Sequence, residues 1–162
     1  MPHVQIFLLL LLASLSYAFW RGGAPERTTA AIFIAGAVGS ALAASPAAAR
    51  WANVELGVLA VDAAMLIAFL ALMIKANRLW PILLMGLQTV QVAGHLLRML
   101  DPKLFPFLYW VTSAFWSYAM VVLLVIATFL HSARLRHRGH DAPWSSSSGP
   151  SSTPARETSP GI

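Results

Sequence analysis

A row of polar side chains interrupts an otherwise apolar stretch of this sequence. In LQTVQVAGHLLRMLD, which runs from residue 87 to residue 101, Gln88, Gln91, His95 and Arg98 follow one another at spacings of three, four and three residues. Such spacings place the four side chains on one face of a helix. Amide, imidazole and guanidinium groups among apolar residues need polar partners. This face therefore predicts either contacts between helices or a pathway for protons.

Two acids in the preceding apolar segment are candidate partners for that row. Glu55 and Asp62 are seven residues apart and so share one helical face. The two segments are expected to form an antiparallel hairpin around the connection KANRLW. Counting outward from its middle, Asp62 falls near the depth of His95, and Glu55 near that of residues 98–101. Acids and bases at equal depth can neutralise each other, which makes these charges tolerable in apolar surroundings.

The next apolar segment adds a third side to this arrangement. If DPKLFP forms a turn, Ser113, Trp116 and Ser117 approach the depth of Gln88 and Gln91. An indole N–H needs an acceptor and a glutamine amide needs several partners, so three helices are expected to share the polar groups. We call the candidate site the polar seam; its residues are Glu55, Asp62, Gln88, Gln91, His95, Arg98 and Trp116.

The composition indicates a membrane protein. Of 162 residues, 58% are hydrophobic and only 10% are charged, which lies outside the range of ordinary soluble domains. The chain has no cysteine, so it has no disulfide, thiolate metal site or cysteine nucleophile. Its formal net charge is +5, but the basic residues stand at the ends of apolar segments. In those places they orient a membrane protein, and nucleic acid is not an expected partner.

Five apolar segments position the polar seam. Each is close to the roughly 20 residues that a membrane-spanning helix needs, and the short connections hold Gly, Pro and charged residues. The predicted fold is all-α, a polytopic membrane bundle of five transmembrane helices in a domain covering residues 1–131. The predicted helices cover residues 4–20, 28–45, 53–74, 80–100 and 105–130.

The distribution of lysine and arginine predicts the orientation of the bundle. With the N-terminus outside and the C-terminus inside, eight basic residues fall on the cytoplasmic side and three on the other. Basic residues near short loops are retained on the cytoplasmic side. Tryptophan favours the headgroup level, and Trp20, Trp51, Trp80 and Trp110 lie at predicted helix ends. The expected location is the inner membrane of a bacterium, with the chain crossing it several times.

The first two apolar segments each allow a second interpretation. The first is expected to stay as a membrane helix, although SYA, ending at Ala18, is also typical of a signal-peptide cleavage site. In the second, two ridges of small residues, 35/39/43 and 36/40/44, let neighbouring backbones approach closely. We expect these ridges to pack within the chain, with a dimer interface as the alternative.

The segment 132–162 differs from the rest of the chain. It begins with basic residues and continues as DAPWSSSSGPSSTPARETSPGI, which lacks the apolar residues that offset the entropy of ordering. We expect a disordered cytoplasmic tail. Its basic part is expected to anchor the topology, and contact with anionic lipid headgroups is the alternative.

Two functions fit the polar seam. The first is structural: the polar groups fix the packing of the helices in a small integral membrane protein that serves as a scaffold, an accessory subunit or an assembly partner. The second is transport of protons or cations, with Glu55, Asp62 and His95 as the relay, because ionisable groups inside a membrane are functional candidates by default. The Gly/Pro-interrupted helix pairs and inverted repeats of many transporters are not evident, which favours the structural interpretation.

An enzyme is a weaker interpretation. Bound haem suits two axial histidines at similar depth, whereas His95 lies towards the outer half and His131 at the inner end of the last segment. His137 and His140 fall in the tail without further metal ligands. No serine, aspartate and histidine set is evident. We expect no enzyme activity, cofactor or metal; the expected partners are the lipid bilayer and either further copies of the chain or a larger membrane complex.

The pattern WANVELGVLAVD, followed by RLWP, HLLRMLDP and FWSYAM, resembles small uncharacterised polytopic inner-membrane proteins of bacteria. The resemblance covers Trp51 to Met120. It implies a membrane location and transfers no functional residue. The chain is similar in size to small multidrug transporters, but those carry their essential glutamate in the first helix.

Overall fold

The computed structural model describes the backbone of residues 2–44, 55–100 and 106–139, and the side chains of residues 4–44, 55–100 and 115–139. This part of the chain forms five α-helices and no strand, so the predicted all-α fold is confirmed. The helices are α1 (Pro2–Arg21), α2 (Ala24–Ala43), α3 (Leu56–Lys75), α4 (Trp80–Leu100) and α5 (Pro106–Arg138).

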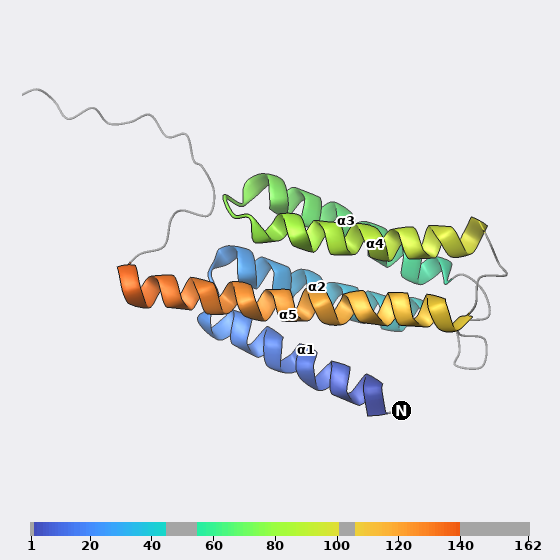
Figure 1. The fold of residues 1–162 in the computed structure, drawn as a ribbon, viewed down its shortest axis with the longest axis horizontal. Coiled ribbons are helices and arrows are strands. Elements are labelled where there is room, and N and C mark those ends of the chain that lie inside the picture. The colour runs from blue at the N-terminus through green and yellow to red at the C-terminus, as the bar shows by residue number, and fades with distance from the viewer. Residues whose placement is uncertain (1, 45–54, 101–105, 140–162) are drawn as a thin grey trace, which may run out of the picture.

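The helices pack as an elongated bundle (Figure 1). α3 and α4 lie side by side, α4 also contacts α5, and α5 contacts α1, which is inclined to the other helices. α2 packs mainly against α3. The shared core contains Leu15, Phe33, Phe69, Leu84 and Leu124. The rings of Phe33 and Phe69 meet edge to face across α2 and α3, with centroids 5.9 Å apart.

α2 begins four residues earlier than predicted, at residue 24 and not 28. The sequence interpretation assigned the charged residues of RGGAPER to a connection, but two of them, Glu26 and Arg27, lie at the start of the helix. Pro25 stands in the first turn, and the Glu26 carboxylate accepts a hydrogen bond from the Gly23 N–H at 3.0 Å. A proline near the start and a glutamate reaching back to the cap are both features that begin helices.

α5 ends at residue 138, eight residues beyond the predicted end at residue 130, so the start of the tail at residue 132 was placed too early. Arg136, His137 and Arg138 stand in the last turn, where positive charge suits the carbonyl end of a helix. Gly139 then adopts a φ of 70° and its N–H donates to the Leu135 carbonyl at 3.0 Å. This left-handed cap terminates the helix. The expected disorder of residues 140–162 lies outside the described residues.

Small residues of α2 let it approach α3 closely. A Cβ atom at Gly36 would overlap the side chain of Met65, and one at Gly39 would lie 3.2 Å from a methyl group of Val61. Farther along, a Cβ at Gly57 of α3 would lie 2.8 Å from the Ala43 carbonyl oxygen. Gly36, Gly39 and Ala43 of the small-residue ridges therefore contact α3 within the chain.

Three helices of the described part of the chain are long and apolar enough to cross a membrane. The candidate spans are Val4–Arg21 in α1, Leu56–Lys75 in α3 and Phe115–Arg138 in α5. α2 is made less apolar by Glu26 and Arg27, and α4 by its row of polar residues. Large hydrophobic side chains such as Leu9, Ile67 and Phe129 are exposed on the outer surface, as in a protein that faces lipid. These features indicate membrane association.

Candidate functional site: a buried polar cluster between α3 and α4

The polar seam has its best-defined contacts around one carboxylate. Asp62 of α3 is 7% exposed, and it faces Gln88 and His95 of α4, which are 1% and 2% exposed. We call these three residues the Asp62 cluster. Gln88 and His95 are seven residues apart, close to two helical turns, so both side chains face α3. α3 and α4 are antiparallel neighbours joined by a short connection, and Asp62 contacts both side chains.

Gln88 contacts α3 through both backbone and side chain. Its Nε2 donates to the backbone carbonyl of Asp62 at 3.0 Å and to the carboxylate Oδ1 at 3.2 Å. One amide group thus fixes the position of α4 against α3 and the orientation of the Asp62 carboxylate. Polar bonds of this kind hold membrane helices together, each worth on the order of 1 kcal/mol.

His95 faces the other carboxylate oxygen. Its Nε2 lies 3.1 Å from Asp62 Oδ2. The distance is that of an ion pair, but the two atoms do not meet the directional criteria of a hydrogen bond. The attraction between an imidazolium and the carboxylate is strongest where water is excluded. The sequence prediction placed Asp62 and His95 at one depth, and the structure brings them into contact.

Glu55 and Arg98 lie at the end of the same helix pair. Glu55 is the residue before α3, Arg98 belongs to the last turn of α4, and both side chains are buried. Each has an interaction partner in the structure. A buried charge is tolerated when it is compensated in this way. Asp101, the other acid considered at this depth, lies outside the described residues.

The polar seam was expected to extend onto α5 through Gln91 and Trp116, but no hydrogen bond joins these two residues in the described part of the chain. Both side chains are half-buried, and Gln91 Oε1 has no hydrogen-bond partner among the described residues. The Trp116 ring packs edge to face against Phe115, with centroids 5.1 Å apart. Ser117 has an interaction partner, whereas the side chain of Ser113 lies outside the described residues. Similar depth alone did not bring these side chains together, because depth does not fix which way a residue faces.

A second group of polar residues was missed by the sequence analysis. Glu26 and Thr29 of α2 are fully buried, although Glu26 was assigned to a connection between helices. The imidazole of His131 on α5 packs against Gly23, leaving no room for a Cβ atom there. The signal that could have located this group is Glu26 itself, three residues after Gly23 in the pattern of a helix start.

Among the described side chains, no group of three or more His, Asp or Glu residues is arranged to hold a metal ion. The contacts of the Asp62 cluster are those of a carboxylate held by an amide and an imidazole. Chemically, the cluster can fix two helices together, or it can exchange a proton between Asp62 and His95.

No protein-family model, curated protein or solved structure matches this chain.

Proposed function

We propose that this chain is a small integral membrane protein of the scaffold, accessory-subunit or assembly-partner type, in which the Asp62 cluster is structural. The carrying observation is the pair of bonds from Gln88 to the backbone and carboxylate of Asp62. A group that grips a backbone carbonyl of the neighbouring helix fixes packing. This arrangement supports a rigid α3–α4 pair whose outer surface is available to other membrane components.

Burial of the Asp62 cluster supports the structural function over transport. The side chains of His95 and Asp62 are 3% and 10% exposed, so little of either can meet water. A relay has to exchange protons with the solvent on both sides of the membrane. Gln88 also restrains the carboxylate that such a relay would have to move.

Transport of protons or cations is the second candidate. It is favoured by the 3.1 Å contact between two ionisable groups, Asp62 and His95, inside an apolar helix pair. Together with Glu55, the residue before the start of α3, these groups would form a relay along one face of the helix. Residues of this kind within membrane segments often mark ion pathways.

For the membrane arrangement we propose five spans, N-terminus outside and C-terminus inside, in the inner membrane of a bacterium. α2 and α4 have 20 and 21 residues, which is about 30 Å at 1.5 Å per residue and matches the other spans. The exposed face of α2 presents Ile34, Val38 and Leu42, and that of α4 presents Leu83, Val90 and Leu97. Apolar outer faces of this kind suit lipid on both helices, and the polar residues of α4 face inward.

A double-mutant cycle combined with a flux measurement tests the proposed function. The variants are Asp62→Leu, His95→Leu and the double replacement, each purified as the full chain. If the cluster is structural, each single variant unfolds at a lower temperature, because one buried polar group loses its partner. The free energy of unfolding should fall by about 3 kcal/mol. The double variant should recover much of that loss. Liposomes containing a pH-sensitive dye should show no proton flux with any of the proteins.

The outcomes separate the two candidates. Proton flux by the wild-type protein that is lost in a stable double variant would establish transport and reject the structural proposal. Single variants as stable as the wild type, with no flux from any protein, would reject both. Thr89→Val provides the control, because Thr89 lies beside Gln88 on α4 but is exposed and bonds only to the Met85 carbonyl of its own helix.

A further inference from the structure

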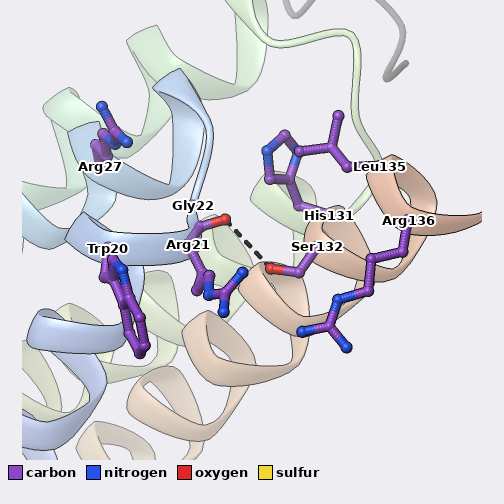
Figure 2. A pocket seen from close by; sticks show the side chains of 8 residues that line it. All are labelled: Trp20, Arg21, Gly22, Arg27, His131, Ser132, Leu135 and Arg136. Atoms are coloured by element: carbon purple, nitrogen blue, oxygen red, sulfur yellow. Dashed lines mark hydrogen bonds between the residues drawn. The ribbon is translucent and has the colours of Figure 1, made fainter. Parts of the chain in front are cut away.

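A basic pocket opens where α1 ends, α2 begins and α5 passes both (Figure 2). It encloses about 500 Å³. Its polar lining includes Arg21 of α1, Arg27 of α2, and His131 and Arg136 of α5, and its apolar lining includes Trp20 and Leu135. Two consecutive helices, α1 and α2, and the distant α5 thus bring four basic side chains to one cavity.

The positive charge of the pocket is not neutralised by the described part of the chain. No described carboxylate lies within ion-pair distance of Arg21, Arg27 or Arg136. The acid of the neighbouring turn, Glu26, is 0% exposed, does not line the pocket, and accepts the Gly23 N–H. Three uncompensated guanidinium groups around one cavity attract an anion.

Hydrogen bonding within the pocket also favours an acceptor-rich ligand. The Ser132 hydroxyl donates to the Arg21 carbonyl at 3.2 Å, so the carbonyl at the end of α1 already has a donor (Figure 2). The Arg21 guanidinium stacks on the Trp20 ring, 4.6 Å from its centroid, which restrains its position. Phosphate has several charged oxygens, and guanidinium groups bind it in a bidentate manner.

The position of the pocket suggests where the phosphate comes from. α1 has 20 residues, about 30 Å, and the pocket lies at its carboxyl end, which is the headgroup level if α1 spans the bilayer. Trp20 is 74% exposed and Leu135 is 41% exposed beside the basic groups. An exposed tryptophan at that depth suits the boundary between acyl chains and headgroups.

We propose that this pocket is a phosphate-binding site, with the guanidinium groups of Arg21 and Arg136 as direct ligands. The phosphate is carried either by an anionic phospholipid headgroup, which the exposed apolar rim favours, or by a soluble phosphate compound. The proposal does not depend on the function of the Asp62 cluster, which lies elsewhere in the bundle.

Native mass spectrometry of the full chain in detergent tests the site. Phosphatidylglycerol and phosphatidylcholine are titrated separately into the wild type, Arg136→Gln and Lys75→Gln. Lys75 is the matched control: it is exposed, stands in the last turn of α3 at the same end of the bundle, and does not line the pocket (Figure 1). Both variants lose one positive charge, and thermal unfolding checks that both are folded.

We expect the wild type and Lys75→Gln to retain phosphatidylglycerol more tightly than phosphatidylcholine, and Arg136→Gln to bind it about fivefold more weakly or worse. Arg21→Gln should act in the same direction. Equal weakening by Arg136→Gln and Lys75→Gln would overturn the proposal, since it would reflect diffuse attraction to net charge. Phosphatidylglycerol binding unaffected by both arginine replacements would also overturn it.

Inorganic phosphate distinguishes the two sources. If the headgroup is the ligand, inorganic phosphate at millimolar concentration leaves the retained phosphatidylglycerol in place. If inorganic phosphate displaces the lipid from the wild type, and binds more weakly to Arg136→Gln, the ligand of the site is a soluble phosphate compound.

Discussion

At the scale of single residues, Gln88 makes a specific contact between helices, whereas the polar side chain that follows it on α4 does not. Gln88 is buried and bonds twice to Asp62, whereas its neighbour Thr89 is exposed and bonds within α4. The two residues lie at nearly the same depth. They differ chiefly in the direction in which their side chains point.

Replacing Gln88 with leucine should destabilise the bundle by about 1 kcal/mol, because the Asp62 carboxylate loses a donor in a buried position. Thr89→Val removes a polar group from the outer face and should change the free energy of unfolding by only a few tenths of a kcal/mol. Unfolding of both variants in mixed micelles with increasing denaturing detergent measures the difference. Equal effects of the two replacements would show that Gln88 contributes no specific contact.

The sequence located the partner of Asp62 only in part. Asp62 and His95 could be paired by depth because a short connection joins two antiparallel helices and so fixes how far along each residue lies. Gln88 was expected to take part in a seam shared by three helices, but no partner on α3 was named for it, because depth contains no information on rotation about the helix axis. The seven-residue spacing from Gln88 to His95 carries that information: it places both side chains on the face that contacts α3.

At the scale of helices, most boundaries followed from the sequence, and the two large errors have one cause. Runs of apolar residues bounded by KANR located the end of α3 and the start of α4 within a residue. Charged residues were assigned to a connection at RGGAPER and to the tail at HSARLRHR. In the structure these charges begin α2 and complete α5, since Glu26 caps an N-terminus and the basic residues suit a C-terminus.

Close packing of α2 on α3 gives a prediction at this scale. Gly57→Ala should destabilise the bundle by about 1–3 kcal/mol, because its new methyl group would lie 2.8 Å from the backbone carbonyl of Ala43 and the helices would have to separate. Gly94→Ala is the control, because no atom lies within 4 Å of a Cβ built at Gly94. Thermal unfolding of the two variants provides the comparison. A stable Gly57→Ala protein would mean that α2 and α3 have freedom to move apart.

The carboxyl end of α5 gives a second prediction at the scale of helices. A chain that stops after His140 keeps the Gly139 cap and the bond from Ser132 to the Arg21 carbonyl, so it should insert and remain monodisperse in detergent. A chain that stops after Leu130 loses that bond and the last two turns of α5, and should be less stable. Size-exclusion chromatography measures both. Aggregation of the longer truncation would show that residues 141–162 contribute to folding.

At the scale of the whole molecule, the apolar and polar residues are distributed as expected for a protein in lipid. Polar groups such as Gln88, His95 and Glu26 are buried, while Leu9, Ile67 and Phe129 are exposed. Three helices satisfy simple requirements of length and apolar composition, and α2 and α4 do not. Their polar residues lower the average hydrophobicity of each helix, but this average takes no account of which face meets lipid.

The number of spans can therefore be decided by accessibility at two connections. With the N-terminus outside, a five-span chain places Asn77 in the cytoplasm and Ala44 outside. If only α1, α3 and α5 cross, the two positions exchange sides, while the C-terminus stays in the cytoplasm in both cases. A reporter fused to the C-terminus cannot separate these arrangements.

Because the chain has no cysteine, single cysteines can be introduced without a background signal. Asn77→Cys and Ala44→Cys are labelled in intact cells with a maleimide that does not cross the inner membrane, and His137→Cys serves as the cytoplasmic reference. For five spans, Ala44→Cys should react in intact cells, and Asn77→Cys and His137→Cys only after lysis, because α2 and α4 then each carry the chain across the bilayer. The reverse labelling of Ala44→Cys and Asn77→Cys, with His137→Cys still protected, would establish three spans and place the polar residues of α4 outside a transmembrane helix.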